Sequence, residues 1–420
     1  MRDVRMKGFA ERTDIEVVEQ FLAERAKPLG GEPVAIVDAI GRVLAEPVRS
    51  EVDVPSFRRS AMDGYAVRGE ETFGASPYDP IVFSVLGQAL PGAPFAGDMP
   101  PGTAVRVMTG APVPDGADAV VMAEVCDEAD GRVEVREAVA PRKHVGAIGE
   151  DIRSGDAVLA AGRRLRPQDA ALLASIGVAE PSCVRRPRVS LLITGDELLP
   201  PGARPHGAHI VDSNSLMLTG LAERDGAQVL PHAILPDRVD TIRDALASAD
   251  AEVLLVSGGS SVGQEDHAPR LVAELGELDF HGVSMRPSSP AGVGRLPGIE
   301  GGRERFVFLL PGNPVSCLCA YEFFAGPTLR ALGGRSRAWP HPRIELPLAR
   351  KIASAVGRTD YVRVAIEADR VVPLATSGAS ILSSTVRADG CVIVPRSAEG
   401  MPEGARVEVL LYDETHPGRA

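Results

Sequence analysis

The sequence predicts a multidomain protein in which an α/β three-layer domain is combined with β-rich parts. Three observations lead to this prediction. The chain has 420 residues, which is too long for one hydrophobic core. A central stretch alternates continuous apolar runs with segments of helical spacing, as in a parallel sheet covered by helices. The stretches before and after it contain short apolar runs separated by Pro and Gly, which is typical of small β domains.

The first predicted domain is a mixed α/β body made of residues 1–50 and 150–185. Residues 11–27 have apolar side chains at helical spacing, and residues 38–45 predict a second short helix. Residues 166–176 predict a third helix, which returns the chain to this body.

Residues 51–149 are expected to form an all-β module inserted into that body. Turn signals such as Pro-Gly and Asp-Gly separate its short apolar runs. The predicted strands are residues 81–86, 104–108, 119–122 and 132–135.

Beyond a short basic linker, residues 186–335 predict the α/β domain, and residues 340–420 predict a small C-terminal β-barrel or sandwich. The strands expected in the α/β domain are residues 189–193, 228–235, 253–256 and 306–310, with helices at 213–224 and 238–249. The strands expected in the C-terminal domain are residues 343–348, 361–366, 391–394 and 406–411.

Three apolar strands of the α/β domain each run into a glycine-containing turn and a helix start. Glycine lets the backbone approach a ligand closely, and free N–H groups at a helix start attract anions. In an open parallel sheet such loops meet along one edge, so we expect a site for a polyanion and a metal there. The residues predicted to bind substrate at these loops are Gly195, Asp196, Ser257, Gly258, Gly259, Ser261, Gly263, Pro311, Gly312, Asn313, Pro314 and Ser316.

Three carboxylates follow the predicted strands and could face the same cleft. Glu197, Asp237 and Asp266 are candidates for holding a hard cation such as Mg²⁺, which takes oxygen ligands from carboxylates and substrate phosphates. N-capping of the following helix is the alternative interpretation for Asp237 and Asp266, because Asp is a preferred cap.

Asp63 is a further catalytic candidate, within the segment Ser60–Val67. We interpret it as a carboxylate that a rigid loop directs towards a ligand or metal, although Asp followed by Gly is also a common turn. Thr109 follows a predicted strand, and its hydroxyl could hold an anion or simply be satisfied within a turn.

Composition excludes several classes of protein. A formal net charge of −12 argues against a nucleic-acid surface, and no apolar stretch approaches the roughly 18 residues needed to span a membrane. The five cysteines contain no CxxC and no histidine pair has ligand spacing, so a zinc site is not expected. A reduced cytoplasmic protein fits this pattern best.

Several motifs, in order, resemble those of the MoeA/gephyrin family of molybdopterin molybdenumtransferases. They are SAMDGYAV (60–67), MTGAPVP with GADAVV (108–121), GED (149–151), TGDEL (194–198), DSN (212–214), SGGSSVG with Asp266 (257–266) and LPGNPVS (310–316). The wider group of molybdopterin-binding proteins would share only the α/β part, so the first of these motifs is the discriminating one.

The resemblance implies a four-part subunit that forms a homodimer with shared active clefts. It implies adenylylated molybdopterin and molybdate as substrates, a divalent cation such as Mg²⁺, and cleavage of the pyrophosphate bond as molybdenum is inserted. Glu197, Asp237 and Asp266 would hold the cation or the attacking water, with Asp63 and Thr109 on the opposite wall. It adds Asp151, Arg286 and Ser383 as substrate-binding residues. A molybdopterin adenylyltransferase and recipient molybdoenzymes are the implied partners.

Three departures from the family keep a second function open, and the clearest of them is a missing lysine. The family usually has Pro-Gly-Lys-Pro where this chain has Pro287-Ser288-Ser289-Pro290, so a lysine is missing beside Arg286. The alternative to an active molybdenum insertase is therefore a non-catalytic paralogue that binds molybdopterin as a carrier or scaffold.

Overall fold

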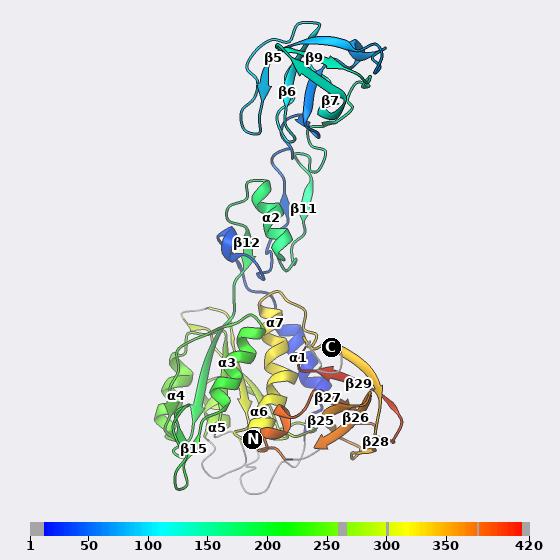
Figure 1. Ribbon diagram of the computed structural model, residues 1–420. Helices are drawn as coiled ribbons and strands as arrows, with labels where there is room; N and C mark the ends of the chain where they lie inside the picture. The colour runs from blue at the N-terminus through cyan, green and yellow to red at the C-terminus, as the bar shows by residue number, and fades with distance from the viewer. Residues whose placement is uncertain (1–11, 259–266, 300–301, 376–377, 414–420) are drawn as a thin grey trace. The chain divides into compact units, whose positions relative to one another are not determined.

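A computed structural model describes residues 12–258, 267–299, 302–375 and 378–413. The chain divides into two compact units: Met1–Glu32 with Val184–Ala420, and Pro33–Cys183. Figure 1 shows the chain coloured from blue at the N-terminus to red at the C-terminus. The long middle segment is thus one unit inserted between two pieces of the other.

The first unit contains a seven-stranded sheet whose strand order is β16-β13-β18-β22-β21-β19, with β17 also paired to β13. The three central strands, β13, β18 and β22, are parallel, and β21 and β19 continue the sheet in antiparallel pairing. The strand bounds are β13 Arg188–Thr194, β16 Gln228–Val229, β17 Ile234–Leu235, β18 Val253–Ser257, β19 Glu277–His281, β21 Gly292–Leu296 and β22 Arg305–Leu310.

The predicted central strands are confirmed because each is a continuous apolar run buried on both faces of the sheet. The prediction of one strand over residues 228–235 is wrong. Two two-residue strands, β16 and β17, pair separately with β13, and Pro231 lies between them. Proline has no N–H to donate to a ladder, which accounts for the interruption.

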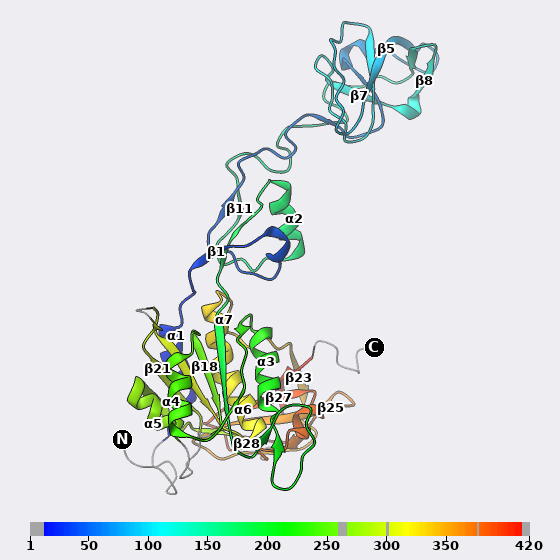
Figure 2. The same cartoon turned by 90° about the vertical axis from the view of Figure 1, so that its left-hand side faces the viewer.

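Helices cover both faces of this sheet, as Figure 2 shows, and complete three layers. Helices α4 and α5 pack together on one face, where a cluster around Leu254, Val256 and Leu271 forms the core. Helices α3 and α6 contact each other on the other face. The bounds are α3 Asn214–Arg224, α4 Val239–Ser248, α5 Ala268–Leu275, α6 Pro314–Ala320, the π-helical η5 Tyr321–Ala325 and α7 Gly326–Leu332.

Helix α1 (Ile15–Arg25) confirms the first predicted helix and belongs to this unit. Its buried face, Ile15, Val18 and Leu22, packs where α1 contacts η5 and α7. The sequence instead predicts residues 1–50 in one body with residues 150–185, because periodicity shows that a helix has an apolar face but not what covers it. None of the helices in the described ranges has the length and apolarity needed to cross a membrane.

The C-terminal strands of the first unit form the predicted small barrel around Val362, Val392 and Val409. The sheet runs β20-β25-β27-β29-β23 with β26 on β25, and a bridge between Leu348 and Val371 joins the end of β23 to β26. The bounds are β20 Met285–Arg286, β23 Arg343–Pro347, β24 Ile352–Ala353, β25 Thr359–Glu367, β26 Arg370–Ala375, α8 Ser383–Val386, β27 Gly390–Val394, β28 Gly400–Met401 and β29 Arg406–Leu411.

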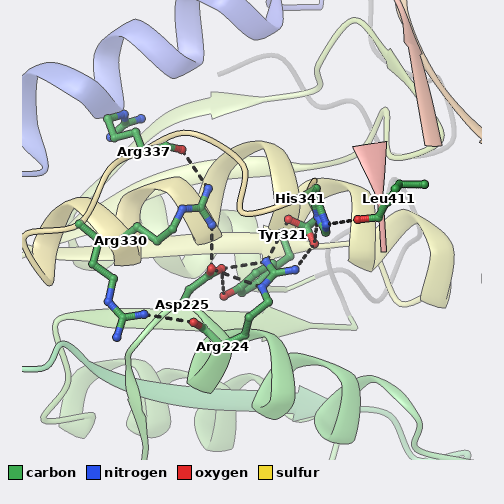
Figure 3. Close-up of polar contacts among 9 residues, drawn as sticks. Arg224, Asp225, Tyr321, Arg330, Arg337, His341 and Leu411 are labelled. Carbon is green, nitrogen blue, oxygen red and sulfur yellow. Dashed lines mark hydrogen bonds and ion pairs between the residues drawn. The ribbon is translucent and has the colours of Figure 1, made fainter. Parts of the chain in front are cut away.

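A buried charge network joins α3, η5 and α7 to residues of the C-terminal part (Figure 3). Arg224 donates to both Glu322 carboxylate oxygens at 2.8 and 3.0 Å. Asp225 forms an ion pair with Arg330 and accepts a hydrogen bond from the Tyr321 hydroxyl. Burial raises the pKa of Glu322, but hydrogen bonds from His341 and Arg224 outweigh it and hold the pKa at about 2. The Glu322 carboxylate therefore stays ionised although it is buried.

The second unit contains a six-stranded sheet with the order β7-β4-β6-β5-β9-β8, within the predicted all-β module. The module strands are β4 Gly64–Val67, β5 Ile81–Ala89, β6 Thr103–Val107, β7 Ala119–Met122, β8 Cys126–Ala129 and β9 Arg132–Val135, with η2 Gly69–Thr72 and η3 Ala123–Val125. The other elements are β1 Gly31–Pro33, η1 Ile36–Asp38, β2 Val48–Arg49, β3 Arg59–Ser60, β10 Val145–Gly146, β11 Ala157–Leu159, α2 Pro167–Ser175 and β12 Ser182–Val184.

Helix α2 confirms the prediction over residues 166–176, but the helix predicted over residues 38–45 is wrong. Only the single turn η1 forms there, and Gly41 has φ +80°. Val43 and Leu44 instead form isolated bridges with Arg164 and Cys183. Their apolar side chains are buried as extended residues rather than on a helical face.

Candidate active site

A cavity of about 480 Å³ lies at the C-terminal ends of the three parallel strands, as the strand-end glycines predicted. It contains two of the predicted carboxylates, Glu197 and Asp237. Its lining is Ile193, Thr194, Glu197, Leu198, Ile210, Val211, Asp212, Ser213, Asn214, Asp237, Ser257, Gly258, Gly312, Asn313, Pro314 and Ser380. Ile210 and Val211 belong to β15 (Ile210–Val211), which pairs with β14 (Leu198–Leu199).

Gly258 brings two of the strand ends close together. Its φ is +98°, and a Cβ at this position would lie 2.2 Å from the Thr194 carbonyl oxygen. Any side chain would therefore clash with the end of β13. The glycine lets β13 and β18 end side by side at the cavity.

Asn214 connects the end of β18 to the residues that follow β22. Its Nδ2 donates to Ser257 Oγ at 2.9 Å and to the Gly312 carbonyl oxygen at 2.8 Å. Asn214 lies in the DSN motif, but the sequence indicates no role for it, because an Asn at the beginning of a helix resembles an ordinary start signal.

Asp237 does not cap the following helix. The residue at the N-cap of α4 is Arg238, and no side-chain cap hydrogen bond forms. The Asp237 Oδ1 atom is buried and has no hydrogen-bond donor among the described residues. A buried carboxylate oxygen in that position suits a cation better than a cap.

The residues present fit a hard cation in part. Glu197 and Asp237 line one cavity, and Mg²⁺ commonly takes one or two carboxylates together with substrate phosphate oxygens. The third predicted ligand, Asp266, lies outside the described residues, as do Gly259, Ser261 and Gly263. Within the described ranges, no group of three or more His, Cys, Asp and Glu residues could hold a metal by itself.

Several other predicted substrate residues lie outside this cavity. Gly195 and Asp196 line a neighbouring cavity of about 590 Å³, which shares Leu198 and Asp212 with the first. Pro311, Ser316 and Ser383 line neither cavity. The C-terminal part contributes Ser380 instead, next to Ala379, whose carbonyl accepts a hydrogen bond from Val315 N.

Arg286 is engaged by a buried carboxylate. It forms an ion pair with Asp360, which is fully buried and also contacts Arg358 and the Ser354 hydroxyl. Its Nε is buried without an acceptor in the described part of the chain. Arg286 therefore has a structural partner that sequence reasoning did not foresee, and it lines neither cavity above.

In the second unit, Asp63 and Thr109 are in direct contact. Asp63 Oδ1 accepts hydrogen bonds from Thr109 N and Thr109 Oγ1, both at 2.7 Å. Asp63 precedes Gly64, where a Cβ would lie 1.9 Å from the Val121 carbonyl oxygen. The glycine thus permits close strand approach at the start of β4, rather than serving only as a turn residue.

Thr109 also lines a cavity of about 500 Å³ in the second unit. Asp151 does not line it. Glu150, the preceding residue, does, and it accepts hydrogen bonds from Arg59 and Ala147 N. Of the GED motif, Glu150 is thus the acid that lines this cavity.

The Thr109 hydrogen bonds lower the pKa of Asp63, with the backbone N–H as the larger cause. We expect an NMR titration to find Asp63 ionised well into the acid range. Thr109→Val, which removes only the hydroxyl, should return the pKa part of the way. Any stabilisation is present above the unfolded pKa and is lost as the pH falls through the lowered folded pKa. Thr109→Ser is the control and should leave the Asp63 pKa at its wild-type value. If Thr109→Val also leaves the Asp63 pKa at its wild-type value, the Thr109 hydroxyl does not lower that pKa.

Comparisons with known proteins agree along almost the whole chain. Residues 14–177 match the MoeA N-terminal region (domain I and II), residues 190–331 a probable molybdopterin binding domain, and residues 345–412 the MoeA C-terminal region (domain IV).

Individual relatives give the same result. A molybdopterin molybdenumtransferase of Haemophilus influenzae is 34% identical over 82% of this chain and 83% of its own length. Molybdopterin molybdenumtransferase 2 of Mycobacterium tuberculosis is 33% identical over 93% and 97%. A crystal structure of a molybdopterin biosynthesis MoeA protein from Pyrococcus horikoshii has a TM-score of 0.81 and 31% identity, covering 96% of this chain and all of that one.

Proposed function

Because this chain belongs to the MoeA family, we propose that it is a molybdopterin molybdenumtransferase, which inserts molybdenum during molybdenum-cofactor synthesis. Relatives with that name match it over most of both lengths. The substrate we propose is adenylylated molybdopterin, whose pyrophosphate bond is cleaved as molybdate is placed on the dithiolene. The non-catalytic carrier or scaffold is not favoured, since relatives that match 82% and 93% of this chain are named as transferases.

The single observation that carries this proposal is the cavity at the three strand ends. Its carboxylates Glu197 and Asp237 suit a cation, and its glycines allow backbone groups to approach phosphate oxygens. The N-terminus of α3 also opens at this cavity, and the positive end of a helix dipole favours anions. A ligand that carries both phosphate and a divalent cation fits this combination.

We assign roles to this chain's residues as follows. Glu197 and Asp237 hold the cation, together with Asp266 as a proposed third ligand. A bound Mg²⁺ would neutralise charge that develops on the pyrophosphate oxygens. The strand-end residues orient the pyrophosphate, and Asp63 with Thr109 acts on the molybdate side. Asp151, Arg286 and Ser383 remain proposed substrate contacts.

The direct test of function is mass spectrometry of the pterin released after incubation with adenylylated molybdopterin, molybdate and Mg²⁺. We expect molybdenum-loaded pterin and stoichiometric AMP. Tight binding of the adenylylated pterin without release of AMP would instead identify a carrier.

We also propose a homodimer in which Asp63 of one subunit completes the site on its partner. Subunits carrying Asp63→Asn mixed with subunits carrying Asp237→Asn should then regain activity. Each hybrid has one cleft with both changes and one with neither. Recovery should approach about a quarter of wild-type activity, because about half of randomly exchanged dimers are hybrids.

The mixing experiment needs proof of exchange, for example by native mass spectrometry of differently tagged subunits. Either variant refolded or exchanged with itself is the control and should stay inactive. Hybrids that form but remain inactive would place both residues in one subunit's cleft.

A further inference from the structure

Asn214 has an orientation that its neighbours fix. It is the first residue of α3, and only 7% of its surface is exposed. Its Nδ2 donates to Ser257 Oγ and to the carbonyl of Gly312. A carbonyl oxygen can only accept, so the amide NH₂ must face Gly312. Both amide hydrogens are thereby used, and Oδ1 is the free atom.

The Asn214 Oδ1 atom is buried and lacks a hydrogen-bond donor within the described part of the protein. One more buried oxygen of the same lining, Thr194 Oγ1, shares this condition, whereas the unpaired Asp237 Oδ1 is assigned to the proposed cation. Buried acceptors without donors are costly, so the occupant of this cavity should supply hydrogen-bond donors.

We propose that Asn214 is a specificity-determining residue, whose Oδ1 accepts a hydrogen bond from an N–H or O–H group on the organic part of the substrate. Its two donated bonds hold the loops after β18 and β22 in the arrangement that this contact needs. The inference rests on the proposed function. The donor can come from the adenosine half or the pterin half, because both flank the pyrophosphate that the cavity would hold.

This role makes a prediction about selectivity rather than stability. A ligand that lacks the donor leaves Oδ1 unpaired on binding, and a site built for a donor discriminates against such an analogue. The expected discrimination is about tenfold in affinity. A residue that only held loops together would weaken all ligands equally when replaced.

The experiment measures binding by calorimetry in the presence of Mg²⁺. One arm compares AMP with 2′-deoxy-AMP, 3′-deoxy-AMP and purine riboside 5′-monophosphate, each of which lacks one donor. The other arm compares 6-hydroxymethylpterin with its 2-desamino analogue. In the wild type, one analogue should bind about tenfold more weakly than its parent, and the arm in which this occurs identifies the half of the substrate.

Three variants separate the contact from the loop connection. Asn214→Ala should abolish the preference for the parent ligand. Asn214→Asp keeps an acceptor but loses the donated bonds, so both ligands should weaken while the preference remains. Ser257→Ala removes one loop bond and leaves Oδ1 in place, so it should also keep the preference. Melting temperatures show which variants fold. If Asn214→Asp does not fold, Ser257→Ala still separates the ligand contact of Asn214 from its role in connecting the loops.

An unchanged preference in Asn214→Ala, or no preference in either arm of the wild type, overturns the inference and leaves Asn214 as a loop connection. Turnover of adenylylated molybdopterin by the wild type separates this failure from failure of the proposed function. Turnover with no effect of residue 214 on selectivity rejects only the inference. No turnover, together with no binding of AMP or the pterin, rejects both.

Discussion

Removal of divalent cations is expected to reduce turnover by about 1,000-fold or more. The described lining of the cavity at the three strand ends contains Glu197, Asp212 and Asp237 but no lysine or arginine. A pyrophosphate bound there would face carboxylates, so its charge must be balanced by a cation. Metal ions supply several kcal/mol of charge stabilisation in such reactions, and about 1.4 kcal/mol corresponds to a factor of ten.

The measurement is AMP release after chelation with EDTA and after readdition of metal. Mg²⁺ and Mn²⁺ should restore turnover, whereas Ca²⁺, which prefers more ligands at longer distances, should restore it poorly. Circular dichroism during chelation shows whether the fold is intact. Full turnover in persistent chelator would remove the metal from the mechanism.

Asp237→Asn should lower turnover by about 100-fold, the usual effect of losing one preorganised electrostatic group. The change is nearly isosteric, and Asp237 makes no cap bond to α4. Its melting temperature should therefore stay close to that of the wild type. Glu197→Gln should act in the same direction, and both variants should need more Mg²⁺ for half-maximal activity.

Asp240→Asn is the matched control, because Asp240 lies exposed in the first turn of the same helix. It should leave both activity and melting temperature unchanged. The double variant Asp237→Asn with Glu197→Gln should lose less than the product of the single effects, since both residues hold one ion. If Asp237→Asn lowers the melting temperature but keeps full activity per folded molecule, Asp237 has a structural role and does not hold the cation.

The central sheet could be predicted because its signal is local. Val253–Val256 is a continuous apolar run, and such runs belong to strands that are buried on both faces. The order of glycine-containing turns then predicted which loops meet at one edge. The cavity lined by Gly258 and Gly312 agrees with that expectation.

Other features depend on contacts that a single sequence does not display. Gly64 resembles a turn residue, but the constraint on it is the Val121 carbonyl of a neighbouring strand. Asn214 resembles a helix start, while its two hydrogen bonds reach residues 43 and 98 positions away. Arg286 resembles a free cation, and its partner Asp360 lies 74 positions further along. In each case the missing information was a tertiary partner.

The packing of α1 has a consequence for the order in which the chain folds. Among the described helices α1 is made first, but its partners η5 and α7 follow about 300 residues later. At about 5–20 residues per second, the ribosome needs roughly 15–60 s to produce them. The intervening unit, Pro33–Cys183, is contiguous and can fold during that interval. During that interval the apolar face of α1 lacks its native partners, so α1, the first of the described helices to be synthesised, is among the last to pack.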